Sequence, residues 1–230
     1  MFYFLDPTML LLIPGMILAA WAQYKVSSAF KKYSGVTTRI GITGAQLAGK
    51  LLESAGIKDV QVVEVPGQLT DNFNPDSNQL SLSRDVYASN SIAALGVAAH
   101  ECGHVMQKFS GYRALGLRRA IVPSVQIGSN LSWPIFLAGM IFSWEPLILA
   151  GIILFSLTVV FTLVTLPVEF NASARAIKTL EAGNYLTQDE LGGAKAVLSA
   201  AALTYVASAL NAILQLARLL LLSRNNRNRD

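Results

Sequence analysis

The stretch His100-Glu101-Cys102-Gly103-His104 contains both histidines of the chain and predicts a helix that presents them together. Side chains four positions apart lie on one face of an α-helix, about one turn from each other. Two imidazoles placed in this way can share one zinc ion, and the glutamate beside the first can reach a water molecule on that ion. The preceding run, 91–99, is small and apolar, which predicts that the imidazoles face an enclosed site. An ordinary amphipathic helix with two solvated histidines is the alternative.

The composition is typical of a membrane protein. Hydrophobic residues make up 53% of the 230 residues and charged residues only 14%, against about 25% charged residues in an average soluble domain. The net charge of +4 fits cations that flank a membrane, and no basic stripe with interleaved aromatic residues indicates nucleic acid. Four apolar segments are each long enough to cross a hydrocarbon core of about 30 Å: 2–22, 121–142, 146–168 and 200–222.

The first apolar segment, 2–22, ends in Ala20-Trp21-Ala22, which resembles the cleavage site of a secretory signal. No basic residue precedes it, however, and Asp6 is the only charge before the run. Basic residues follow it instead, beginning with Lys25 and Lys31. By the positive-inside rule we expect an uncleaved anchor whose N-terminus lies outside and whose other end leads into the cytoplasm.

The two central segments are free of charge and predict a transmembrane hairpin. The segment 146–168 is expected to span the membrane, and Pro123 and Pro134 predict a kink in the span 121–142. The turn 143–146 would join the two spans.

The topology of the fourth segment, 200–222, is open. Asn211, Gln215 and Arg218 form a polar stripe along one side of it. Such a stripe fits a helix that faces the protein interior, one that lines the site, or one that lies in the membrane interface. The length of the segment favours a crossing, whereas the basic tail 224–230 argues for an end that stays inside.

The region between the first two spans predicts a small domain of helices and strands. Helical spacing covers 43–56, with Thr43 as the N-cap and Gly56 as the C-terminal stop. The alternation over 60–65 predicts a strand, and 71–78 has turn residues throughout.

A second strand is predicted over 79–83, and two roles are open for it. One is a sheet edge that holds an extended peptide through main-chain hydrogen bonds, and the other is a mere cover for the zinc helix. The zinc helix itself is expected to begin at Ser89, Asn90 or Ser91.

A catalytic zinc site usually has three protein ligands, and the chain has no third histidine. Glu169 is the favoured third ligand, because it follows the span 146–168 and emerges beside the zinc helix if that span returns to the cytoplasm. Its alternative role is an acid near a helix N-terminus. Cys102 projects to another side of the helix than His100 and is interpreted as core filler, and as the single cysteine it suits a reducing compartment. The remaining candidates occupy solvated or turn-like surroundings: Glu53, Glu64, Glu181 and Glu190.

Residues near the three ligands are candidates for outer roles. A helix continuing from Glu169 would place Asn171, Ser173 and Arg175 beside the ligands. Hydrolysis also needs a donor for a developing oxyanion, and Arg175 and Tyr205 are the available residues.

The chain resembles the YugP-like neutral zinc metallopeptidases of bacterial membranes, which are similar in arrangement to the heat-shock membrane zinc proteases and the prenyl-protein endopeptidases. The resemblance covers most of the chain and rests on four blocks: 69–83, 97–107, 166–176 and 201–207. It implies that His100, His104 and Glu169 bind Zn²⁺ and that Glu101 is the general base. One departure is visible, since heat-shock proteases commonly carry an aspartate where this chain has Ser173.

The predicted fold class is mainly α and membrane, an α-helical transmembrane bundle with a small cytoplasmic α+β, zincin-like (gluzincin) catalytic region. The expected parts are a transmembrane anchor (1–22), a cytoplasmic catalytic region with the HExxH helix (23–120), a transmembrane hairpin (121–168), a third-ligand helix with a cytoplasmic segment (169–198), and a membrane helix with a basic tail (199–230).

We therefore expect an integral protein of a bacterial-type cytoplasmic membrane that hydrolyses peptide bonds on the cytoplasmic side, with membrane-protein quality control as a candidate role. Its expected partners are a peptide or membrane-protein substrate and the lipid bilayer, while oligomeric state and accessory proteins are open. Two alternatives remain. One is an intramembrane zinc protease, although the Leu-Asp-Gly tripeptide typical of that class is absent. The other is a non-catalytic scaffold or transporter subunit with a structural metal.

Overall fold

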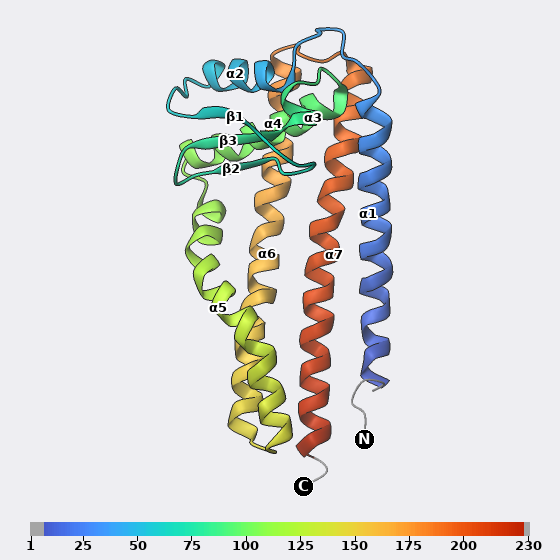
Figure 1. Ribbon diagram of the computed structural model, residues 1–230, viewed down its shortest axis with the longest axis vertical. Helices are drawn as coiled ribbons and strands as arrows, with labels where there is room; N and C mark the ends of the chain where they lie inside the picture. Colours follow the sequence, from blue (N-terminus) through green and yellow to red (C-terminus); the bar gives the residue numbers. More distant parts are fainter. Residues whose placement is uncertain (1–6, 228–230) are drawn as a thin grey trace. The chain divides into compact units, whose positions relative to one another are not determined.

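The computed structural model describes residues 7–227 and is mainly helical (Figure 1). Its helices are a 3₁₀ helix (Pro7–Leu12), α1 (Ile13–Ser34), α2 (Gly44–Ser54), α3 (Arg84–Tyr87), α4 (Ile92–Phe109), α5 (Arg113–Ile141), α6 (Glu145–Ala182) and α7 (Gln188–Arg227). Its strands are β1 (Gln61–Val65), β2 (Asn72–Asn74) and β3 (Gln79–Ser83). The parts of the expected anchor and tail at 1–6 and 228–230, Asp6 among them, lie outside the described residues.

The chain divides into two compact units. The helical unit comprises Met1–Ala22, Leu117–Leu166 and Thr204–Asp230, and the mixed unit comprises Gln23–Gly116 and Pro167–Leu203. Helices α1, α5, α6 and α7 each contribute residues to both units. The five-part division made from the sequence stays a prediction.

The mixed unit contains a three-stranded sheet in the order β1-β3-β2. β1 pairs in parallel with β3, and β2 pairs antiparallel with β3. The strand expected over 79–83 is therefore the central strand, and the interpretation that it offers an open edge to a peptide is wrong. β2 was also missed, because 71–78 was predicted to be a turn throughout. Turn structure is confined to its second half, where the Asn74 side chain accepts hydrogen bonds from the amides of Asp76 and Ser77.

Local signals place α2 and the core of the mixed unit. Thr43 and Gln46 form the reciprocal hydrogen bonds of a capping box, and Gly56 ends the helix with a φ of 70°. The buried face of α2 packs on α4. Buried residues of β3, α6 and α7 complete the same hydrophobic core. The largest fully buried side chains of this core are Leu47, Leu51, Leu80, Leu82, Val86, Leu95, Val105, Leu180 and Leu191.

The expected hairpin of α5 and α6 is present in the helical unit. Ser143 adopts a φ of 48°, and the Trp144 amide donates to the Gly139 carbonyl at 2.9 Å. Glycine allows the two helices to approach closely, because a Cβ on Gly151 would lie 2.8 Å from the Phe136 Cα. Small residues at such contacts are common where helices pack within a membrane.

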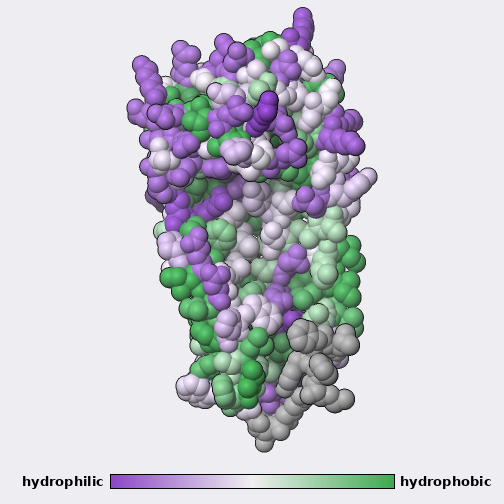
Figure 2. Space-filling view, in the orientation of Figure 1, coloured by the Kyte–Doolittle hydropathy of each residue, from purple (hydrophilic) through white to green (hydrophobic). Residues whose placement is uncertain are grey.

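Three helical stretches in the described residues are long and apolar enough to cross a membrane: Pro7–Ser34, Glu145–Ala182 and Gln188–Asn226. α5 is not among them, since Gln126, Asn130 and Ser132 lower the hydropathy of the predicted span 121–142. That second span stays a prediction. Hydrophobic residues gather on the surface of the helical unit, while hydrophilic residues cover much of the mixed unit (Figure 2).

The polar stripe of α7 faces the interior of the helical unit. Arg218 is buried and its Nε donates to the Thr8 hydroxyl at 3.3 Å. Asn211 lies against Gly15 of α1, where any Cβ would overlap its side-chain oxygen. Asn211 and Arg218 therefore pack against the N-terminal helices. Whether α7 crosses the membrane or lies in the interface stays a prediction.

Candidate metal centre

The helix that carries both histidines is α4. It begins at Ser91, whose hydroxyl accepts a hydrogen bond from the Ala94 amide at 3.2 Å, and it ends before Gly111, which has a φ of 64°. Of the three predicted caps, Ser91 is the observed one. His100 and His104 follow each other by one turn, and their ring centroids are 4.8 Å apart.

Close packing of α4 against α6 brings the third side chain to the histidines. Gly103 faces the backbone of Ala172, where a Cβ would lie 3.0 Å from the carbonyl carbon and closer still to the oxygen. Only glycine allows this approach, and Glu169 lies one turn before Ala172 on α6. The two helices thus meet at the level of the histidines.

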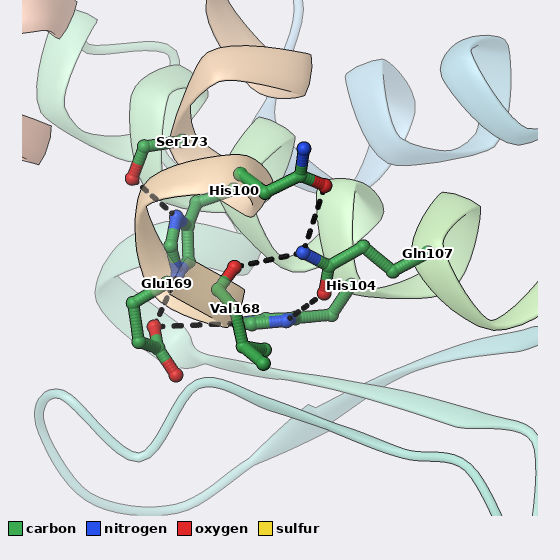
Figure 3. A network of polar contacts seen from close by, with 7 residues as sticks. His100, His104, Gln107, Val168, Glu169 and Ser173 are labelled. Carbon is green, nitrogen blue, oxygen red and sulfur yellow. Dashed lines mark hydrogen bonds and ion pairs between the residues drawn. The ribbon is translucent and has the colours of Figure 1, made fainter. Parts of the chain in front are cut away.

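The structure brings His100, His104 and Glu169 together at one point (Figure 3). Glu169 Oε2 lies 3.3 Å from His100 Nε2 and 3.5 Å from His104 Nε2. The three ligand atoms lie within 4.8 Å of one another. The Glu169 side chain is only 3% exposed, and the two histidines are 14% and 13% exposed, so the three side chains are largely screened from solvent.

A serine orients the first histidine. His100 Nδ1 lies 3.1 Å from the Ser173 hydroxyl oxygen, one turn of α6 beyond Glu169. If this Nδ1 carries the proton and donates to the hydroxyl, the lone pair of Nε2 points at the shared site. Of the three predicted neighbours, Ser173 is the one in direct contact with a histidine.

A buried glutamine, which was not predicted from the sequence, orients the second histidine. His104 Nδ1 lies 3.0 Å from Gln107 Oε1. Gln107 Nε2 donates to the Val168 carbonyl at 2.7 Å and to Asn171 Oδ1 at 3.1 Å. Because both partners of Nε2 are acceptors, Oε1 must face His104, whose Nδ1 must therefore donate. Gln107 is fully buried and lies three residues after His104, on the same helix face.

The network continues outward from Asn171. Arg175 Nε donates to Asn171 Oδ1 at 2.8 Å, and its guanidinium lies over the Tyr112 ring at 5.9 Å. The Tyr112 hydroxyl in turn donates to the Pro167 carbonyl at 3.4 Å. Asn171 and Arg175 therefore support His104 through Gln107 and do not contact a histidine themselves.

The charges around the site favour a cation. Burial alone would lower the pKa of His104, but its bond to Glu169 and the negative charges of Glu101 and Glu169, with a further bond to Gln107, raise it. Burial raises the pKa of Glu101, against the opposing effect of the two histidines. Glu101 is 8% exposed. Two carboxylates beside two imidazoles thus stabilise positive charge at the point where the ligand atoms converge.

The donor set fits a zinc ion. Zinc bonds to histidine nitrogen and carboxylate oxygen of about 2.0–2.2 Å in a tetrahedral site place the ligand atoms roughly 3.3 Å apart. The separations of 3.3 and 3.5 Å between Glu169 Oε2 and the two Nε2 atoms match that spacing. The largest separation among the three ligand atoms, up to 4.8 Å, exceeds it, so the side chains would close slightly around a bound ion. Both Nδ1 atoms have partners outside the site, as is usual for metal-binding histidines.

The other candidates lie apart from the three ligand atoms. Cys102 is buried in the core, and its thiol faces the Ala48 carbonyl on α2, which confirms the interpretation as core filler. Glu190 accepts hydrogen bonds from the amides of Arg39 and Thr187. Tyr205 belongs to the helical unit, and a role for it stays a prediction.

Comparison with known proteins agrees with this site. Residues 8–224 match a family model described as "Putative neutral zinc metallopeptidase". The chain is 44% identical over 220 residues to "Putative membrane protease YugP" of Bacillus subtilis (strain 168), a match that covers 96% of this chain and 98% of the relative. No solved structure matches. The chain therefore belongs to the family described as putative neutral zinc metallopeptidases.

Proposed function

We propose that this protein is an integral-membrane zinc endopeptidase in which His100, His104 and Glu169 hold the ion and Glu101 is the general base. The observation that carries the proposal is the convergence of both Nε2 atoms on one oxygen of Glu169, at 3.3 and 3.5 Å. The family and the relative named as a membrane protease support the same reaction class.

Each protein group has a defined task in this proposal. Zinc supplies Lewis acidity, which polarises a carbonyl and makes a water molecule acidic enough to attack near neutral pH. The Glu101 carboxylate accepts the proton of the attacking water and later delivers it to the leaving amine. Its burial suits this task, because a carboxylate with a raised pKa holds a proton more readily than an exposed one. Ser173 and Gln107 keep both imidazoles in the orientation that ligation needs.

The proposed substrate is an extended peptide segment, including segments of membrane proteins. β2 is an edge strand of the sheet in the described part of the chain, and it packs on α4. Its outer edge offers main-chain groups to which an extended chain can add regardless of side-chain identity. We therefore assign the binding of an extended peptide to β2 and no longer to β3, which is the central strand.

A cytoplasmic site is the proposed topology. The chain passes between the helical and mixed units at four junctions, after Ala22, Gly116, Leu166 and Leu203. If each junction coincides with a membrane boundary, both segments of the mixed unit, Gln23–Gly116 and Pro167–Leu203, lie on the same side of the membrane. Three lysines follow the first span, Lys25, Lys31 and Lys32, and by the positive-inside rule they support a cytoplasmic position for that side. A role in membrane-protein quality control would follow from such a site.

Replacing Glu101 by Gln tests the proposed activity. The full-length protein is purified in detergent, its zinc content is measured, and cleavage of casein and of membrane-protein substrates is followed. We expect Glu101→Gln to keep zinc and the fold while cleavage falls by at least about 10²-fold, the lower range for losing a general base. A wild type that binds zinc yet cleaves nothing in the panel would favour the scaffold or transporter alternative.

A further inference from the structure

A groove of about 590 Å³ runs between α6 and α7 in the mixed unit. Ligand sites commonly have volumes of about 300–1,000 Å³. The groove is lined by Phe170, Ser173, Ala174, Ile177, Lys178 and Glu181 of α6 and by Lys195, Leu198, Ser199, Ala202 and Leu203 of α7. None of the three proposed zinc ligands lines it, so the groove is distinct from the metal centre.

The groove is apolar toward one end and charged toward the other. Phe170 and Leu203 mark the end nearest the residues at which α6 and α7 pass into the helical unit. Phe170 is 49% exposed. Such exposure of a large apolar side chain at this end of the groove favours contact with an apolar ligand. Both helices are long and apolar enough to cross a membrane.

Three charged side chains line the other part of the groove. Lys178 and Glu181 come from α6 and Lys195 from α7, and all three are exposed. Neither lysine has an ion pair in the described residues. Two ammonium groups and one carboxylate give the groove a net charge of +1, with the two cations on opposite walls.

We propose that this groove binds one anionic phospholipid. The phosphate of the headgroup lies between the Lys178 and Lys195 ammonium groups, and an acyl chain follows Ile177, Phe170 and Leu203 toward the membrane spans. The net charge of +1 complements the single negative charge of phosphatidylglycerol. Basic pockets between transmembrane helices commonly receive such headgroups on the cytoplasmic side, where anionic lipids attract cations. A peptide segment would need acidic side chains at this end of the groove to pair with both ammonium groups.

The groove also connects to the metal centre through one residue. Ser173 lines the groove, and its hydroxyl is 3.1 Å from His100 Nδ1. A lipid seated in the groove therefore lies against the helix turn that orients the first histidine. Lipid binding itself does not depend on the proposed protease activity, so the two can fail separately.

Lipid retention by the full-length protein tests the proposal. The protein is exchanged into detergent micelles with equal amounts of phosphatidylglycerol and phosphatidylcholine, and the bound lipids are counted by native mass spectrometry. We expect one phosphatidylglycerol to be retained in preference to phosphatidylcholine. The variant Lys178→Ala/Lys195→Ala should lose that affinity by about 30-fold, because each cation near an anionic headgroup contributes about fivefold.

Two further variants control for general effects of charge and folding. Lys50→Ala/Lys58→Ala removes two exposed lysines elsewhere in the mixed unit and should retain phosphatidylglycerol as the wild type does. Ser199→Trp should block the groove without a change of charge, since Ser199 is exposed and lines it. Zinc content, measured in parallel, reports whether each variant is folded.

Three results would overturn the proposal. The first is equal retention of the two lipids by the wild type. The second is that the Lys178→Ala/Lys195→Ala variant retains phosphatidylglycerol as well as the wild type and the Lys50→Ala/Lys58→Ala control do. The third is displacement of the bound lipid by inorganic phosphate alone, or the finding of a co-purified peptide in its place, which would assign the groove to another ligand.

Discussion

Gly103 of α4 faces the backbone of Ala172 on α6 so closely that no side chain fits between them. This contact sets the separation of the helix that carries both histidines from the helix that carries Glu169. A residue that belongs to the variable part of the HExxH motif thus determines whether Glu169 can reach the two histidines.

Gly103→Ala is expected to separate α4 from α6. The added Cβ overlaps the Ala172 carbonyl, and overpacking of this kind costs about 1–3 kcal/mol. We predict a lower midpoint of thermal unfolding and weaker zinc binding, both measured in one detergent. Gly49→Ala is the matched control, because Gly49 lies in α2 and a Cβ added there would meet nothing within 4 Å. It should raise stability by about 1 kcal/mol through helix propensity. Equal thermal midpoints and zinc affinities for the two variants would show that this contact does not set the separation of α4 and α6.

Gln107 is expected to control zinc affinity through His104. In Gln107→Leu, His104 Nδ1 loses its acceptor, and loss of such a partner costs about 10–100-fold in metal affinity. Gln107→Glu keeps an oxygen for Nδ1 but gives up the donors to Val168 and Asn171, so its loss should be smaller. Competition with a chromogenic chelator measures both. The same affinity for the two variants would contradict an orienting role.

Ser173 is expected to act on His100 in the same way. Ser173→Ala removes the partner of Nδ1 and should weaken zinc binding by about tenfold, the lower end for such a loss. Ser173→Asp supplies a carboxylate acceptor at the same place and should restore the affinity. The visible spectrum of the cobalt-substituted protein provides a second readout, since it reports on ligand geometry. A Ser173→Asp variant as weak as Ser173→Ala would argue against this hydrogen bond.

Asp71 makes the stability of the mixed unit depend on pH. Burial raises the pKa of Asp71 above its ordinary value of 3.8, although Ser83 donates two hydrogen bonds that oppose the shift. A raised folded pKa favours folding below the ordinary value, and this contribution is lost as the pH rises through the folded pKa. Asp71→Asn should therefore stabilise the protein at pH 7 and have little effect near pH 4.

Unfolding in the presence of a chelator at both pH values checks this prediction without interference from bound metal. Asp59→Asn, at an exposed position, is the control. A gain for Asp71→Asn that is as large at pH 4 as at pH 7 would contradict a raised pKa for the folded Asp71.

Features set by neighbours in sequence were predictable. The capping box of α2 needs only Thr43 and Gln46, and the pairing of His100 with His104 needs only the helix period. Glu169 was predicted as the partner of the histidines because it follows a strongly apolar run, and the structure places it beside them.

Features that depend on distant partners were not predictable. β2 has only three residues and forms because it pairs with β3. The turn residues around it gave no local sign of this pairing. The sequence around Gln107 does not indicate its role, because the Val168 carbonyl that fixes the direction of its amide lies 61 positions later. Its position one turn after His104 was the available signal. The direction of the α7 stripe likewise follows from Thr8 and Gly15, at the opposite end of the chain.

The central claim is that α4 and α6 hold one ion together, and zinc affinity of the wild type and of Glu169→Gln measures it most directly. The substitution keeps the size of the side chain but removes the charge and the carboxylate oxygen that both histidines face. We predict one tightly bound zinc per chain in the wild type and an affinity at least about 100-fold lower in the variant, the upper range for losing even an outer partner. An unchanged stoichiometry and affinity in Glu169→Gln would contradict the account.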